Sequence, residues 1–335
     1  MKRPRVLVLT LGGTISMTPA ADGGLRPALG ADALLQAVPG LGDVAEIAAE
    51  SHLAKPGASL SFDDLAGTAA RIRAAFAQGV EGVVVVQGTD TIEDTAFVLD
   101  LLAAGTGPVV VTGAMRPPGA AGADGPANLL AAVRVAASRE ARGCGVLVVL
   151  NDELHAARLV QKTHTSATSA FASPGFGPVG LVAEGRVRVV ARLANVTSVP
   201  GLEGGNHAPV AQVSLGLGED GRILPTLHGL GYRGVVIEAM GAGHVPGSAV
   251  EAIAFAASQM PVVLCTRVRG GPVFTATYGF PGSELDLLRL GVIPGGMLTA
   301  SKARLLLSLL LGTPWRRAEI IQAFQDFADP CRATG

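Results

Sequence analysis

The chain has 335 residues, of which 49% are hydrophobic and only 4% aromatic, and its formal net charge is −1. This length suits about two domains, since single domains cluster near roughly 100–200 residues. The near-neutral charge leaves no basic surface that would indicate a nucleic-acid partner. The three cysteines, Cys144, Cys265 and Cys331, are widely spaced and form no CxxC pair, which favours a reducing compartment and no structural zinc.

Short apolar, β-branched runs alternate with helical patterns along the chain. Strands are predicted at Val6–Leu9, Val83–Val86, Val109–Thr112, Val146–Leu150, Val235–Ile237 and Val262–Cys265. Helices are predicted at Asp32–Val38, Phe62–Gln78, Glu93–Ala103, Ala127–Ala141, Ser248–Ser258 and Leu298–Leu311. Ser61 is a predicted N-cap followed by acidic residues, and Gly79 is predicted to end that helix. The alternation of strand and helix indicates parallel sheets with right-handed crossovers.

The stretch Ala183–Gly221 interrupts this alternation. Tight turns between short strands are predicted at Glu184-Gly185-Arg186 and at Asp220-Gly221, and the segment Asn195–His207 is rich in Pro, Gly and Asn. We therefore predict an α/β fold with a larger, mostly parallel N-terminal domain and a smaller C-terminal α/β domain. The predicted bounds are residues 1–191 for the first domain, 192–212 for the linker and 213–335 for the second domain.

The N-terminus imitates a secretory signal, because Lys2-Arg3 precedes the apolar run Val6–Leu9. That run is too short for a signal peptide and ends in Gly12-Gly13, so it is interpreted as the first strand. The amphipathic run Leu298–Leu310 carries a lysine and an arginine and is too short to cross a membrane. We expect a cytoplasmic protein without a membrane segment.

Two G-x-G-x-x-G matches, Gly216–Gly221 and Gly229–Gly234, do not predict a dinucleotide site. Such a site needs the glycines to follow a strand and to open a helix. The first match leads into a proline-containing segment, and the second precedes a strand. Since the sequence also lacks G-x-S-x-G, P-loop and H-E-x-x-H motifs, we expect neither a cofactor nor a metal.

The segment Leu11–Ser16 follows the first predicted strand and contains Gly12-Gly13 and Thr14. Paired glycines at the carboxyl end of a parallel strand let the backbone approach a ligand closely, and open α/β sheets bind ligands at this edge. The Thr14 hydroxyl is either a nucleophile or a helix cap, and the glycines alone do not decide between the two.

The segment Gln87–Thr91 also follows an all-valine strand and precedes a predicted helix. Thr91 and Asp94 resemble a capping box in which Asp replaces the usual Glu. Thr91 alone would serve as that cap. Thr89 and Asp90 are then not needed for capping the helix, which favours a functional site at the end of the strand.

The third segment, Arg158–Thr165, contains Lys162 before a Ser/Thr-rich loop. A lysine in such a place is usually solvated, yet a buried lysine can serve as the base that a hydroxyl nucleophile needs. His155 and His164 lie in the same region and are interpreted as structural residues that accept or donate hydrogen bonds, not as metal ligands.

These three segments, in this order, resemble the bacterial-type L-asparaginase and glutaminase-asparaginase family. The resemblance covers essentially the whole chain. It is carried by Gly12–Ile15, Gln87–Ala96, Thr112–Pro117, Ala123–Leu129, Asn151-Asp152, Ala157-Arg158, Lys162-Thr163, Phe171, Ser173-Pro174, Gly177-Pro178 and Ser301–Arg304.

The resemblance implies a hydrolase acting on side-chain amides of amino acids, with L-asparagine as the leading substrate and no cofactor. Thr14 would be the nucleophile and form an acyl-enzyme while ammonia leaves. Lys162 would draw the proton from Thr89, and Asp90 would hold the substrate α-amino group. Backbone N–H groups near Thr89 and Ala114 would face the developing oxyanion.

The resemblance also implies which residues bind the substrate and that a second subunit completes the site. The implied binding residues are Gly13, Ser59, Gly88, Thr89, Asp90, Ala114, Met115, His244 and Glu284. Of these, Glu284 matches the acidic residue that the family supplies from a neighbouring subunit, and His244 stands where the family has an asparagine. A homo-oligomer, commonly a tetramer built from dimers, is therefore implied.

The sequence departs from the family at two positions. Leu25 stands where members carry a tyrosine on the loop after the first threonine, and Gly57 stands where they carry a serine that binds the substrate carboxylate. Ser59 is two residues away and could substitute for that serine. The alternatives are therefore a family member acting on another small amide and a weakly active relative that binds amino acids. The ammonia-supplying amidotransferase subunit is disfavoured, because its threonine motif follows an extra domain.

Overall fold

The protein is described from a computed structural model over residues 3–13, 17–19, 25–27, 35–103, 105–194, 199 and 201–327. The chain divides into two compact units, Met1–Ser198 and Val199–Gly335. Each unit has its own sheet and its own core of buried hydrophobic residues. The two-domain α/β architecture predicted from the sequence is thereby confirmed, while the linker bounds of 192–212 remain a prediction.

The first unit is built on an eight-stranded sheet with the strand order β12-β11-β8-β7-β6-β5-β1-β4. Its strands are β1 (Arg5–Thr10), β4 (Glu46–Ser51), β5 (Gly82–Val86), β6 (Val109–Thr112), β7 (Val146–Leu150), β8 (Glu153–Ala156), β11 (Gly180–Ala183) and β12 (Arg186–Val189). The strands from β4 to β7 are parallel, and β8, β11 and β12 continue the sheet in antiparallel pairs. Two small antiparallel pairs lie outside it: β2 (Met17–Pro19) with β3 (Leu25–Pro27), and β9 (Gln161–Lys162) with β10 (Phe171–Ala172).

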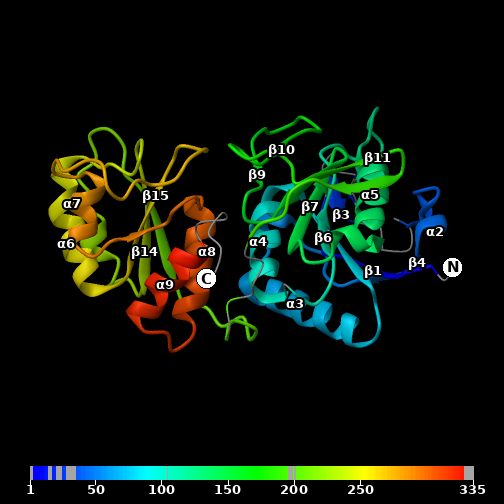
Figure 1. Ribbon diagram of the computed structural model, residues 1–335, viewed down its shortest axis with the longest axis horizontal. Coiled ribbons are helices and arrows are strands. Elements are labelled where there is room, and N and C mark those ends of the chain that lie inside the picture. The colour runs from blue at the N-terminus through cyan, green and yellow to red at the C-terminus, as the bar shows by residue number, and fades with distance from the viewer. Residues whose placement is uncertain are drawn as a thin grey trace. The chain divides into compact units, whose positions relative to one another are not determined.

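Helices cover both faces of this sheet. The helices of the unit are α2 (Leu41–Val44), α3 (Phe62–Ala77), α4 (Ile92–Ala103) and α5 (Gly125–Ala137), with short 3-10 turns η2 (Gly57–Ser59), η3 (Thr89–Thr91) and η4 (Arg139–Ala141). Helices α3 and α4 pack together on one face, and α5 packs on the other (Figure 1). The strands β5, β6 and β7 are buried throughout, which is why they read as continuous valine and leucine runs.

The ends of the helices test the sequence prediction most closely. Ser61 forms a capping box with Asp64 at the start of α3, and Gly79 follows the helix with a φ of 82°, as expected. The prediction that α5 extends to Ala141 was wrong, because this helix ends at Ala137. Ser138 is extended there, and its hydroxyl accepts the N–H of Glu140 to begin η4.

Three further expectations, two turns and a helix, can be compared with the described residues. The predicted turn at Glu184-Gly185-Arg186 does connect the antiparallel strands β11 and β12. The turn at Asp220-Gly221 does not join two short strands, because the 3-10 turn η5 (Leu224–Thr226) follows it. Of the helix predicted at Asp32–Val38, the described part is helical only at Leu35 and Gln36, and the rest lies outside the described residues or in a turn.

The second unit has a four-stranded parallel sheet in the order β13-β14-β15-β16. Its strands are β13 (Val210–Ser214), β14 (Gly234–Ala239), β15 (Val262–Thr266) and β16 (Ile293–Pro294). The remaining elements are η6 (Gly247–Ala249), α6 (Val250–Gln259), α7 (Glu284–Arg289), α8 (Ala300–Leu311) and α9 (Arg317–Phe327). Helix α8 packs on β13, β14 and β15 (Figure 1). Helix α6 belongs to a hydrophobic core that also contains every second residue of β14 and β15.

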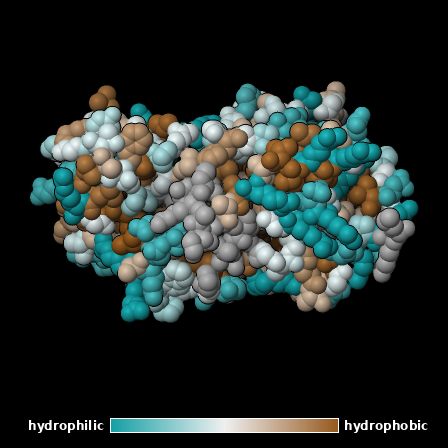
Figure 2. Space-filling model, viewed as in Figure 1, coloured by the Kyte–Doolittle hydropathy of each residue, from teal (hydrophilic) through white to brown (hydrophobic). Residues whose placement is uncertain are grey.

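The surface mixes hydrophilic and hydrophobic residues on the face shown in Figure 2. Large apolar side chains that reach solvent include Phe255, Phe274, Tyr278 and Phe280. None of the helices in the described ranges is long and apolar enough to cross a membrane. Cys144 and Cys265 are both buried free thiols.

Candidate active site

The carboxyl ends of β1 and β5 meet through glycines. Gly13 has a φ of +96°, and a Cβ atom there would lie 2.0 Å from the backbone nitrogen of Gly88. Gly12 has a φ of +110°, and its Cβ would lie 2.4 Å from the carbonyl oxygen of Lys55. Only glycine fits such a backbone at such a distance, so the two glycines are needed for the loops to approach each other. Thr14, which follows them, lies outside the described residues.

The loop after β6 closes the same edge and is held by residues whose role the motifs did not reveal. The backbone N–H groups of Met115 and Arg116 each donate to a carboxylate oxygen of Asp124, both at 2.9 Å. The amide nitrogen of Asn128 donates to the carbonyl oxygen of Gly113 at 3.0 Å. Ala114, a residue expected near the oxyanion, is buried beside this network. Asp124 and Asn128 both lie in the segment Ala123–Leu129, which carries part of the family resemblance. That segment is the sequence signal that could have indicated their role.

Lys162 brings the second and third sequence segments together. Its Nζ donates to Thr89 Oγ1 at 2.9 Å and to Asp90 Oδ1 at 2.8 Å. Thr89 is 7% exposed, and the Lys162 side chain is 17% exposed, whereas the Asp90 side chain is 71% exposed. The hydroxyl is therefore shielded from water while the carboxylate faces outward. Such a set can move a proton at Thr89 Oγ1 and hold a cationic group at Asp90.

The N-terminus of α4 follows Thr89 and Asp90 directly in the chain, and its first residue, Ile92, donates its backbone N–H to Thr89 O. Thr89 and Asp90 lie in η3, which leads directly into α4. The first backbone N–H groups of a helix have no partner within the helix and, with the helix dipole, favour a negative charge. A developing oxyanion near Thr89 would therefore be stabilised by the position of the helix.

Thr91 has a different role from the cap expected in the sequence. Its hydroxyl donates to the carbonyl oxygen of Gly57 at 3.0 Å and accepts from the Gln87 amide at 3.2 Å. A Cβ atom on Gly57 would lie 3.1 Å from Thr91 Oγ1 and 3.1 Å from Gly88 O. The 3-10 turn η2, which includes Gly57 and Ser59, is thereby held against η3, and Ser59 itself is exposed.

A buried ion pair supports the segment that leads to Lys162. Arg158 Nε donates to Asp100 Oδ2 of α4 at 3.3 Å, and the second carboxylate oxygen accepts the backbone N–H of Val146 at 2.8 Å. Burial lowers the pKa of Arg158, and the Asp100 carboxylate opposes that shift. The pair connects α4 with β7 and with the segment that precedes β9. It thereby helps to hold Lys162 of β9 in place relative to Thr89.

The two histidines of this region are structural, as expected. His155 is buried, with Nδ1 3.0 Å from Ser173 Oγ and Nε2 3.3 Å from a Glu153 carboxylate oxygen. Burial lowers the pKa of His155 in spite of Glu153. His164 Nδ1 accepts two backbone N–H groups of its own loop. Across the described ranges, no group of three or more His, Cys, Asp or Glu side chains could hold a metal ion.

The remaining two predicted residues meet in the second unit. Glu284 is fully buried, and its Oε1 accepts the backbone N–H groups of Thr277 at 2.9 Å and Tyr278 at 2.6 Å. His244 Nε2 lies 3.2 Å from the other carboxylate oxygen. Burial tends to raise the pKa of Glu284, but the Tyr278 and Thr277 N–H groups outweigh it and hold the pKa below its ordinary value. Glu284 is therefore an anion with a fixed orientation.

Both units match sequence families with a described function. Residues 5–195 match "Asparaginase, N-terminal", and residues 209–324 match "Glutaminase/Asparaginase C-terminal domain". The chain is 35% identical to the "Probable L-asparaginase" of Deinococcus radiodurans, over 96% of this chain and 97% of that protein. It is 33% identical to the "Probable L-asparaginase periplasmic" of Haemophilus influenzae, over 97% of this chain and 93% of that protein.

A solved structure agrees with these matches. The crystal structure of the "Probable Cytoplasmic L-asparaginase from Campylobacter jejuni" has a TM-score of 0.86 and 32% identity to this chain, covering 96% of this chain and 99% of that one. The chain belongs to the asparaginase family. The resemblance inferred from the motifs is thereby confirmed.

Within the asparaginase family fold, the predicted residues fall into two groups. Gly13, Gly88, Thr89, Asp90, Ala114, Met115, Ser59 and Lys162 lie in the first unit, and His244 and Glu284 lie in the second. The structure joins Lys162 to Thr89 and Asp90, and it joins His244 to Glu284. The side chain of Leu25, at the family's tyrosine position, lies outside the described residues.

Proposed function

We propose that the protein is an L-asparaginase that hydrolyses L-asparagine to L-aspartate and ammonia. The observation that carries this proposal is the hydrogen-bonded set of Lys162, Thr89 and Asp90 at the carboxyl edge of the first sheet. The names of the relatives and of the solved neighbour support it.

The reaction would begin at Thr14. Its hydroxyl oxygen attacks the side-chain amide carbon of the substrate, and a tetrahedral oxyanion forms. The C–N bond then breaks, ammonia leaves with the proton taken from the hydroxyl, and an acyl-enzyme ester remains on Thr14. Backbone N–H groups near Thr89 and Ala114 would stabilise the oxyanion, because preorganised donors stabilise the charge as it develops.

The second half of the reaction would use the Thr89 set. Lys162 would accept the proton of Thr89 Oγ1 while that oxygen takes a proton from the water that attacks the ester carbon. As the ester C–O bond breaks, the proton would return through Thr89 to the Thr14 oxygen, which leaves aspartic acid and the free Thr14 hydroxyl. Asp90 would hold the substrate α-ammonium group through a charge-assisted hydrogen bond, and its exposed carboxylate is open to such a ligand.

Oligomer and compartment belong to the same proposal. His244 and Glu284 would bind substrate in the site of a neighbouring subunit, and the tetramer is the expected assembly. The exposed aromatic rings of Tyr278 and Phe280, which contact His244 edge-on, support a face that another subunit covers. A cytoplasmic location is supported by the name of the Campylobacter neighbour and by two buried free thiols.

Ammonia release tests the proposal. Wild-type protein and Thr14→Ala are compared on L-asparagine, L-glutamine and D-asparagine. We expect turnover of L-asparagine by the wild type and a loss of roughly 10³-fold or more in the variant, since removing a nucleophile leaves only binding and oxyanion stabilisation. Equal rates in the two proteins would remove Thr14 from the mechanism. Tight aspartate binding without turnover would favour an amino-acid-binding protein, and faster turnover of another amide would reassign the substrate.

A further inference from the structure

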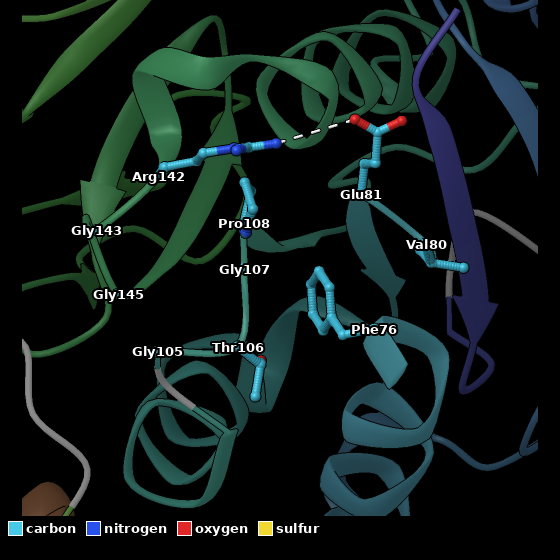
Figure 3. Close-up of a pocket in the computed structure, with 10 residues that line it drawn as sticks. All are labelled: Phe76, Val80, Glu81, Gly105, Thr106, Gly107, Pro108, Arg142, Gly143 and Gly145. Carbon is cyan, nitrogen blue, oxygen red and sulfur yellow. Dashed lines mark ion pairs between the residues drawn. The ribbon is translucent and has the colours of Figure 1, made fainter. Parts of the chain in front are cut away.

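A cavity of about 380 Å³ lies at the edge of the first sheet opposite the candidate active site. Three loops form it, and each leads into the amino end of one of the neighbouring parallel strands β5, β6 and β7. The lining residues are Phe76, Val80, Glu81, Gly105, Thr106, Gly107, Pro108, Arg142, Gly143 and Gly145 (Figure 3). None of the residues proposed for catalysis is among them.

One side of this cavity carries a pair of opposite charges. The Arg142 guanidinium and the Glu81 carboxylate reach toward each other in Figure 3, with 3.9 Å between Nη2 and Oε2. Their side chains are 58% and 48% exposed, and the second carboxylate oxygen faces the backbone N–H of Arg5 at 3.4 Å. A pair this long and exposed contributes little to folding, so a ligand that replaces it would cost the folded state little.

The cavity also has apolar lining residues. These are Phe76, Val80 and Pro108, and in Figure 3 Pro108 lies beside the Arg142 side chain. The Phe76 ring lies against the backbone of Gly107, where a Cβ atom would be only 2.2 Å from the ring. Glycine at this position therefore lets the ring approach the backbone of the loop closely.

We propose that this cavity binds a free α-amino acid with an apolar side chain. An α-amino acid carries an ammonium and a carboxylate group on one carbon, which matches Glu81 beside Arg142, and guanidinium groups bind carboxylates through two parallel hydrogen bonds. The apolar side chain would cover Phe76. The volume is at the low end of the roughly 300–1,000 Å³ found for small-molecule sites, which suits a ligand of this size. A polyanion would face the Glu81 carboxylate, and an uncharged ligand would form no ion pair with either side chain.

Two helices connect the cavity with the candidate active site. Phe76 lies at the end of α3, and the Thr106 hydroxyl donates to Ala103 O at the end of α4 at 2.8 Å. Arg73 of α3 donates to Leu102 O of α4 at 2.8 Å, also near the cavity. At their opposite ends the same helices follow η2 and η3, which the Thr91 hydroxyl joins. Because these helices end at both places, we expect amino-acid binding at the cavity to change turnover at the candidate active site, a consequence that rests on the proposed function.

Isothermal titration of L-leucine into the full-length protein tests the site directly, because leucine has no side-chain amide to hydrolyse. Wild type is compared with Arg142→Ala, Glu81→Gln and the control Arg139→Ala, an exposed arginine of η4 outside the cavity. Each cavity variant is expected to bind roughly tenfold or more weakly, the effect of losing one charge-assisted hydrogen bond, while the control binds normally. N-acetyl-L-leucine lacks the ammonium and L-leucinamide lacks the carboxylate, so both should bind as weakly as the variants.

Two results would overturn the site: no binding of L-leucine, L-phenylalanine or L-methionine to the wild type, or equal binding to all the variants. Ammonia release from L-asparagine is then measured with and without L-leucine. A change in the wild type that Arg142→Ala lacks supports the connection to Thr89, and binding without any such change refutes it. A protein that binds leucine through Arg142 but releases no ammonia would refute the proposed function and leave the cavity site standing.

Discussion

Replacing Lys162 with methionine removes the group that contacts both Thr89 and Asp90. Methionine has a side chain of similar length, but it can neither accept a proton from Thr89 nor form an ion pair with the Asp90 carboxylate. General bases contribute about 10²–10⁴-fold to turnover. We therefore expect kcat for L-asparagine to fall by about 10²-fold or more, which corresponds to about 2.7 kcal/mol or more of transition-state free energy.

The folded state should lose much less than the transition state. The Lys162–Asp90 pair has a distance of 2.8 Å, but the Asp90 side chain is 71% exposed. Exposed pairs of this kind contribute about 0–1 kcal/mol to the free energy of unfolding. Urea denaturation of Lys162→Met should therefore differ from the wild type by no more than about 1 kcal/mol, while ammonia release collapses.

Lys162→Arg is the matched control for the nature of the effect. It keeps the positive charge beside Asp90, but a guanidinium remains protonated and cannot take a proton from Thr89. We expect it to be nearly as inactive as the methionine variant. Near-normal turnover by Lys162→Met would refute the role of Lys162 altogether, and near-normal turnover by Lys162→Arg would show that its charge, not its basicity, is needed.

Three other substitutions test separate parts of the structure. Gly13→Ala should abolish ammonia release, because its Cβ would lie 2.0 Å from the Gly88 nitrogen at a φ of +96°; an active variant would contradict the glycine contact. Asp100→Ala should lower the free energy of unfolding by about 3–5 kcal/mol, as urea denaturation would show, since it leaves Arg158 buried without this partner. A loss below about 1 kcal/mol would mean that the pair is not structural. Leu25→Tyr should raise kcat if position 25 is the family's tyrosine position, and an unchanged kcat would reject that alignment.

Much of the fold follows from local sequence because its physical cause is local. Strands buried on both faces of a parallel sheet must be apolar at every position, so the runs ending at Val86 and Thr112 were recognisable. The start of α3 was equally plain, since a capping box uses only Ser61 and Asp64, three residues apart. The end of α5 was missed because Ala137 and Ala141 are both good helix formers, and the competing hydrogen bond at Ser138 decides where the helix stops.

The site was predicted from motifs and completed by long-range contacts. The sequence by itself determined that Thr89 and Asp90 follow a buried strand and offered Lys162 as a base, and the family resemblance paired Lys162 with Thr89. Only the tertiary structure decided that a lysine 73 residues away reaches Thr89, because the distance depends on how β9 lies beside α4. It also decided that Thr91 bonds to Gly57, a position where the sequence could show only the loss of a serine.

The cavity of Arg142 and Glu81 left no motif in the sequence. Apart from Phe76 of α3, its residues come from three separate loops, and each loop has the sequence of an ordinary connection between a helix and a strand. What they share is their place at the amino ends of neighbouring parallel strands, and that proximity exists only when β5, β6 and β7 are paired. Local patterns thus determined the elements and their chemistry, whereas the pairing of the strands decided which side chains meet.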